Sequence, residues 1–236
     1  MTIKPTPFAA LVLLIGATGS GAQMAPGDVS AAGNEPFWRV DIASDAFTLL
    51  RPDFDPLMLS VIDRSTGADG THLIVSASSS PALRAVLSLA PGPCNDTMAD
   101  QTYPFTATLE LGDTVLSGCG GDPRALLTAS EVWTVTEIAG EAPIDDTEVE
   151  IGFSPEGGVF GTGGCNRLNG TYQITGEGLS FGPIASTRMA CPEDIMAQEQ
   201  AFFAALEQVI SFDIGEDGAL ILRGPEGPVM RAVAAE

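Results

Sequence analysis

The acidic side chains best placed for acid–base chemistry lie in the segment CNDTMADQTYP, from Cys94 to Pro104. Asp96 and Asp100 flank a short run that leads to Tyr103, and a pair of carboxylates is what glycoside hydrolases use to cleave a sugar bond. The same carboxylates could supply oxygen ligands to calcium, although the segment is too poor in acids for an EF-hand loop. Loop aspartates are common turn formers, so we expect neither a catalytic residue nor a metal site here. Asp96, Asp100 and Tyr103 are instead candidates for a binding surface.

A second polar segment, GTGGCNRLNG, is rich in glycine but lacks the Gly-Lys-Ser/Thr ending of a phosphate-binding loop. We therefore expect a tight turn that carries a disulfide. Asn166, Arg167 and Asn169 are expected either to hydrogen-bond the turn backbone or to form a small polar binding surface. Arg188 could be a buried charge partner for an acidic side chain, or it could belong to the same candidate binding surface. We favour the structural roles for all four residues.

The cysteines indicate disulfides rather than catalysis. The chain has four of them: Cys94, Cys119, Cys165 and Cys191. No two form a C-x-x-C pair, which argues against a zinc ribbon or a thioredoxin-like site. Four cysteines allow three pairings, and the domain division given below favours Cys94–Cys119 and Cys165–Cys191. His72 is the only histidine, so a cysteine nucleophile with a histidine base has little support.

Charge and the N-terminus restrict the partners and the compartment. The chain of 236 residues has a net charge of -21, which argues against binding to nucleic acid, because no basic patch is present to contact phosphates. Lys4 precedes an apolar run over residues 8–15, and small residues follow up to Ala22. This is the plan of a secretory signal, and its apolar run is too short to span a bilayer. We expect a periplasmic or secreted protein with no membrane span in the mature chain.

The chain must divide into parts that position these residues. We expect a signal peptide over 1–22, a flexible leader over 23–32, a β-rich domain over 33–119, a linker over 120–129 and a second domain over 130–236. In the first domain, residues 105–111 alternate with period two, as in a half-buried strand. Residues 83–89 are expected to be a strand or a short helix that ends at Pro91–Pro93.

The second domain contains the one long amphipathic helix that we expect. Asn169-Gly170 predicts a type I′ hairpin, because both central positions of that turn need positive φ. Residues 192–210 predict a helix, with Pro192 at its first position and one apolar face. The predicted fold class is therefore mainly β with an α+β C-terminal domain, in which the amphipathic helix packs on a β-sheet.

Three segments of the second half resemble the META (HslJ-like) domain family. They are Trp133 with Ile138-Ala139-Gly140, the segment GTGGCNRLNGTY, and FGPIASTRMACP running into the helix. The resemblance implies a small α+β fold of bacterial envelope proteins that are associated with heat or antibiotic stress, with no established activity. Some members are lipoproteins, but no cysteine lies at the cleavage region here, so a lipid anchor is not implied.

The first half resembles another envelope domain, which opens with G-x-E-P-F-W. The residues that match are GNEPFW, from Gly33 to Trp38, and the segment CNDTMADQTYP. That domain usually has serine where this chain has Ala99, and it implies no known chemistry.

We expect an exported, non-catalytic envelope protein that binds a partner or supports the envelope under stress. The partner is an unknown envelope protein or ligand, and no cofactor is expected. The alternative is a carboxylate-dependent hydrolase that acts on an envelope substrate. A deep pocket with two close carboxylates would favour the hydrolase, and solvent-facing Asp96 and Asp100 would favour the binding module.

Overall fold

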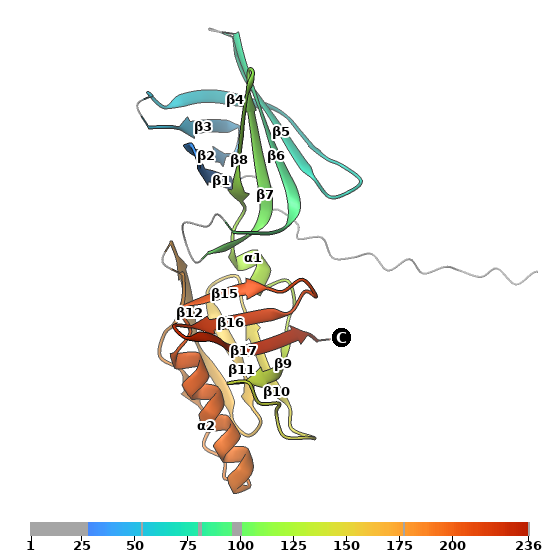
Figure 1. Cartoon of the computed structure of the whole chain (residues 1–236), viewed down its shortest axis with the longest axis vertical. Coiled ribbons are helices and arrows are strands. Elements are labelled where there is room, and N and C mark those ends of the chain that lie inside the picture. The colour runs from blue at the N-terminus through green and yellow to red at the C-terminus, as the bar shows by residue number, and fades with distance from the viewer. Residues whose placement is uncertain (1–27, 53, 80–81, 96–100, 177, 236) are drawn as a thin grey trace, which may run out of the picture.

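The computed structural model describes residues 28–235, apart from 53, 80–81, 96–100 and 177. Its strands form a closed barrel and a separate nine-stranded sheet, each around its own hydrophobic core (Figure 1). One amphipathic helix packs on the C-terminal sheet. These observations confirm the predicted fold class. The export signal expected over 1–22 lies outside the described residues.

The first domain is an antiparallel barrel in which each strand pairs with the next one along the chain and the last pairs with the first. Its strands are β1 (Val29–Asn34), β2 (Phe37–Ala43), β3 (Ala46–Leu50), β4 (Leu57–Thr66), β5 (His72–Ser79), β6 (Ala82–Asn95), β7 (Thr102–Leu111) and β8 (Thr114–Gly120). The predicted strand over 105–111 is confirmed, since Phe105, Ala107 and Leu109 point into the core. Eight strands enclose an interior that side chains can fill.

Two boundaries of the barrel differ from the prediction. Strand β1 begins at Val29, so residues 29–32 are not a flexible leader; Val29 and Ala31 are buried in the core. Strand β6 continues past Pro91 and Pro93 to Asn95 instead of ending there. The pairing of β6 with β7 shifts register between Pro91 and Cys94. Prolines are tolerated at such a bulge, because the backbone there does not need the N–H donor that proline lacks.

The barrel closes at a seam between β1 and β8 where the two backbones lie very close together. Ala31 pairs with Gly120 and Ala32 with Cys119. A Cβ atom on Gly118 would overlap the carbonyl oxygen of Ala32, which explains why glycine is needed there. Trp38 is fully buried, and its Nε1 donates a hydrogen bond of 3.0 Å to the carbonyl oxygen of Ser117.

The segment 120–129, predicted to be a linker, is largely part of the second domain. It contains the short helix α1 (Arg124–Leu127), and Leu127 is fully buried in the second core. The Trp133 Nε1 donates a hydrogen bond of 2.7 Å to the carbonyl oxygen of Leu127. The apolar side chain of Leu127 therefore extends the second domain upstream of the predicted boundary at residue 130.

The second domain is a sheet with the strand order β13-β12-β11-β10-β9-β17-β16-β15, and β14 pairs with β12. Its strands are β9 (Trp133–Ile138), β10 (Val149–Phe153), β11 (Gly158–Gly163), β12 (Arg167–Thr175), β13 (Gly178–Phe181), β14 (Ala185–Ser186), β15 (Ser211–Ile214), β16 (Leu220–Gly224) and β17 (Gly227–Ala234). A hydrogen bond of 2.9 Å from the Leu179 amide to the carbonyl oxygen of Ile210 links the two ends of this sheet.

Helix α2 (Glu193–Glu207) covers this sheet through Phe202, Ala205 and Leu206. Pro192 is its N-cap, and the helix ends three residues before the predicted end at Ile210. The amide of Ile210 instead donates to the carbonyl oxygen of Arg223 at 2.8 Å, which leads the chain into β15. No helix among the described residues is long and apolar enough to cross a membrane.

The hairpin predicted at Asn169-Gly170 is wrong, because both residues lie inside the continuous strand β12. Asn169 pairs with Phe160 of β11 and with Ala185 of β14, and Gly170 pairs with Val159. A Cβ atom on Gly170 would lie 3.1 Å from the side chain of Ile184. The glycine therefore serves close packing on β12 and not a turn.

Candidate functional site

The disulfide pairing expected from the domain division is present. Cys94 is bonded to Cys119 and Cys165 to Cys191, with Cα atoms 5.6 Å and 6.2 Å apart. Each bridge lies within one domain. The bridges agree with an oxidising environment, where disulfides form and persist.

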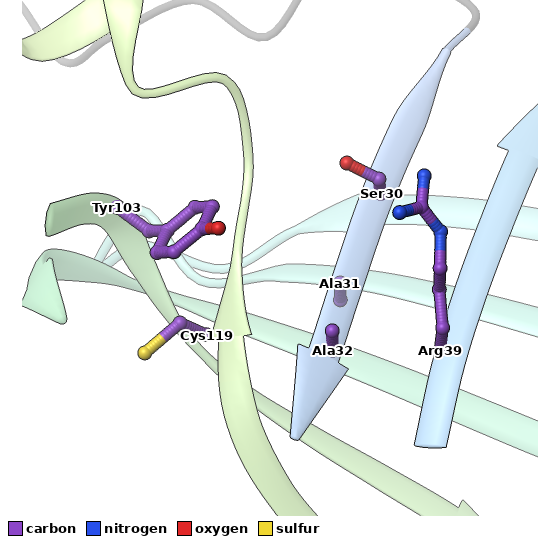
Figure 2. Close-up of a pocket in the computed structure, with 6 residues that line it drawn as sticks. All are labelled: Ser30, Ala31, Ala32, Arg39, Tyr103 and Cys119. Atoms are coloured by element: carbon purple, nitrogen blue, oxygen red, sulfur yellow. The ribbon is translucent and has the colours of Figure 1, made fainter. Parts of the chain in front are cut away.

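The predicted carboxylate pair cannot be placed, because Asp96 and Asp100 lie outside the described residues. Tyr103 is half-buried on β7 and lines a small cavity of about 60 Å³ at the barrel seam (Figure 2). The other lining residues are Ser30, Ala31, Ala32, Arg39 and Cys119. The Tyr103 hydroxyl points toward the strand that carries Ser30 (Figure 2).

Arg39 is the cationic residue among those that line this cavity in the described structure, and its charge is balanced by Asp41. The Arg39 Nε and Nη2 atoms donate to the carboxylate of Asp41 at 2.8–3.1 Å. This hydrogen bonding raises the pKa of the Arg39 guanidinium above its ordinary value, so the group stays charged. With its positive charge balanced, the cavity suits a water molecule or a small neutral polar group. Its described lining does not include the pair of carboxylates that a glycosidase needs.

A second polar cluster lies beside the Cys165–Cys191 bridge, and its centre is Asn166. This residue is 4% exposed, and its side chain is fully used in hydrogen bonds. The Asn166 Nδ2 donates to Glu199 Oε2 at 2.8 Å, and its backbone amide donates to Glu199 Oε1 at 2.6 Å. The Asn166 Oδ1 accepts from Thr187 Oγ1 at 2.9 Å and from the Met189 amide at 2.7 Å. Asn166 therefore joins helix α2 to the segment that follows β14.

This network corrects the prediction for Arg188, which is exposed and not a buried charge partner. The buried acid of this region is Glu199, which is 7% exposed and is held by Asn166. Burying a neutral amide beside the carboxylate avoids the cost of stripping water from a second ion. Arg188 can therefore point into solvent.

Sequence reasoning missed Glu199, although the chain carries a signal for it. The apolar face of α2 runs through Ile195, Phe202 and Leu206, and Glu199 falls on the same face by its spacing. A charged residue within an apolar helical face indicates a buried partner. That partner could not be identified from the sequence, because Asn166 is far away along the chain.

Arg167 and Asn169 are exposed on β12, next to the segment that carries Arg188. The Arg167 amide donates to Thr187 Oγ1 at 3.2 Å, and the Thr187 amide donates to the Arg167 carbonyl oxygen at 3.1 Å. Arg39, Arg124, Arg223 and Arg231 each form an ion pair with an aspartate. Among all the residues that the structure describes, no carboxylate lies within ion-pair distance of Arg167 or Arg188.

We call Arg167, Asn169 and Arg188 the arginine surface. Its side chains are exposed, while the backbone beneath it is fixed by the Cys165–Cys191 bridge and the Asn166 network. Over the described ranges, no group of three or more His, Cys, Asp or Glu side chains is arranged to hold a metal ion. What this surface can do chemically is to donate hydrogen bonds to an anionic group, since the guanidinium fork matches carboxylate and phosphate oxygens.

Residues 125–236 match the family model of the META domain, so the C-terminal half of this chain is a META domain. A search of curated proteins gives no match. The chain is similar to a solved NMR structure of a protein from Burkholderia xenovorans, with 23% identity and a TM-score of 0.40, over 48% of this chain and 88% of that one. It is similar to a second NMR structure, with 19% identity and a TM-score of 0.39, over 48% of this chain and 95% of that one.

Proposed function

We propose that this chain is an exported, non-catalytic envelope protein whose META domain binds an anionic partner through the arginine surface. The observation that carries the proposal is that Arg167 and Arg188 are exposed on neighbouring segments with no carboxylate of the described residues in ion-pair distance. The chain has 31 acidic residues and 10 basic ones, so acids to neutralise these two arginines are abundant. Two exposed arginines without such a neighbour are therefore available to a partner.

The framework beneath these arginines supports a binding role. The Asn166 side chain holds both the Thr187 hydroxyl and the Met189 amide, so the segment that carries Arg188 has a defined course. A fixed backbone reduces the conformational entropy that binding costs. Positive groups at the rim of an interface also favour a partner that places a negative group against them. The partner we propose is an envelope protein or ligand that presents carboxylate or phosphate groups.

The export part of the proposal is supported by the apolar run over residues 8–15 and by the two disulfides. Its test is N-terminal sequencing of the protein isolated from the periplasm or the medium of its own host. The expected mature chain begins near Gln23. Bulk protein that retains Met1 and fractionates with the cytoplasm would contradict export.

The binding part is tested by affinity capture from envelope extracts with the full mature chain. We compare the natural sequence with the double variant Arg167→Gln/Arg188→Gln and with the control Arg84→Gln. Arg84 is an exposed arginine on β6 of the barrel, which makes it a matched control for the loss of surface charge. We expect one or more partners to be retained by the natural chain and by the control, lost from the double variant, and weakened by added salt. An identical set of retained proteins for all three chains would contradict the proposal.

A further inference from the structure

The barrel and the META domain are connected by a very short stretch of chain. Strand β8 ends at Gly120 and α1 begins at Arg124, so residues 121–123 form the whole covalent connection. The Gly121 amide donates to the carbonyl oxygen of Ser30 at 2.9 Å, and its φ of +90° is one that glycine adopts readily. A Cβ atom here would also clash with Pro104 and Phe105. The chain therefore leaves the barrel in a fixed direction.

A second, non-covalent contact joins the domains at the first residue of β7. Thr102 is only 3% exposed, and its Oγ1 donates a hydrogen bond of 2.7 Å to Asp213 Oδ1 on β15 of the META domain. The other carboxylate oxygen, Asp213 Oδ2, accepts from Arg223 Nε on β16 at 2.6 Å. The Asp213 carboxylate thus connects one barrel strand to two strands of the other domain. Hydrogen bonds that involve a charged group are stronger than neutral ones.

The Cys94–Cys119 bridge lies directly beside this contact. In the β6–β7 ladder, Asn95 pairs with Thr102 and Cys94 pairs with Tyr103. On the other side of β7, Cys119 of β8 pairs with Thr106. The bridge therefore holds β6 and β8 together at the end of the barrel where β7 meets the META domain. Without it, the last residues of β6, which follow a register shift, would lose their covalent tie.

We propose that Thr102, Asp213 and Arg223 form a latch between the barrel and the META domain, and that the Cys94–Cys119 disulfide keeps this latch closed. With the disulfide intact, the short connection and the latch fix the two domains at two points. A dithiol reductant opens it by giving two electrons and two protons: the S–S bond breaks, Cys94 and Cys119 become thiols, and the reductant becomes a disulfide. The end of β6 then separates from β8, Thr102 loses its fixed position, and the two domains reorient independently.

The test measures NMR residual dipolar couplings of the full mature chain, which report whether two domains tumble as one body. Four chains are compared: the natural one, Thr102→Val, the double variant Cys94→Ser/Cys119→Ser, and the control Thr106→Val. Thr106 is exposed on the same strand, so its replacement removes a hydroxyl without touching the latch. Couplings within each domain also show whether that domain is folded.

We expect one alignment tensor to fit both domains in the natural chain and in the Thr106→Val control. The Thr102→Val chain and the disulfide-free chain should each lose this common tensor and require two tensors of different magnitude. A single tensor in the Thr102→Val chain would overturn the latch. A single tensor in the disulfide-free chain, or a barrel that unfolds without the bridge, would overturn the role given to the disulfide, while Thr102→Val still tests the latch.

Discussion

Replacing Glu199 by glutamine is expected to destabilise the META domain strongly, although the two side chains have nearly the same shape. Both carboxylate oxygens accept hydrogen bonds from Asn166, at 2.6 Å from its backbone amide and at 2.8 Å from its Nδ2. A glutamine amide has a single oxygen, so its NH2 group must face one of these two donors whichever way it is turned.

The size of the effect follows from what is lost. One hydrogen bond to a charged group, worth about 1.5–3 kcal/mol, disappears, and a buried donor is left without an acceptor. We expect a loss of about 2–4 kcal/mol in the free energy of unfolding, out of a total of about 5–15 kcal/mol for a typical domain. For a domain of this size the melting temperature should fall by on the order of 10 °C.

The assay is thermal and urea unfolding of the mature chain, followed by circular dichroism. Its control is Glu207→Gln, which makes the same chemical change at an exposed position at the end of α2 and should change stability by no more than about 0.5 kcal/mol. Replacing a buried ion by a neutral group can also stabilise a protein, by removing its desolvation cost. If Glu199→Gln is as stable as the control or more stable, the Asn166–Glu199 network does not hold this region as described.

Three further predictions concern the two domains. A fragment beginning at Asp122 should unfold cooperatively in urea. A fragment beginning at Ser130 should be less stable by about 2–5 kcal/mol, because it lacks the buried side chain of Leu127. Equal urea midpoints for the two fragments would contradict this prediction. Trp38→Phe should cost the barrel about 1–3 kcal/mol in thermal unfolding, because it removes the donor to Ser117, and an unchanged melting temperature would argue against that bond. Burial raises the pKa of Tyr172 above its ordinary value of 10.0, so its neutral form is favoured in the folded state. The stability that this gives should be complete below the pKa of Tyr172 in the unfolded chain and be lost as pH rises through its pKa in the folded chain. In urea titrations at alkaline pH, Tyr172→Phe should show a smaller loss of stability with rising pH than the natural chain. Identical pH profiles for the two chains would contradict this prediction.

Much of the fold could be predicted because the signals were local. The alternation over residues 105–111 and the apolar face of the C-terminal helix both reflect burial of one side of a regular element. The cysteine pairing followed from dividing the chain into two domains, each of which contains two of the four cysteines. These features depend on neighbours in the sequence or on the number of domains.

The errors arose where distant strands decide the local structure. Asn169-Gly170 has the composition of a hairpin turn, but pairing with β11 and β14 keeps it extended. Pro91 and Pro93 look like a strand end, but a register shift against β7 accommodates them. Leu127 falls in the predicted linker because its burial depends on the core that forms after it.

The candidate site could be predicted only in part for the same reason. The composition of the polar segment around Asn166 marks it out, and the structure brings it together with the segment around Arg188. The hydrogen-bond partner of Asn166 on α2 was missed, since residues 166 and 199 meet only in the folded chain. Arg188, predicted as a possible buried charge partner, is exposed, and the buried acid Glu199 is paired with Asn166 instead.

The central claim, that the arginine surface binds a partner in the envelope, is tested most directly by photo-crosslinking in living cells. A photoreactive amino acid is placed at Asn169 on the arginine surface and, in a separate control, at Val115, which is 63% exposed on the barrel. We predict a crosslinked product from position 169 that is absent from position 115 and disappears when Arg167 and Arg188 are both changed to glutamine. Products of equal yield from both positions, or a product at position 169 that persists without the two arginines, would contradict the claim.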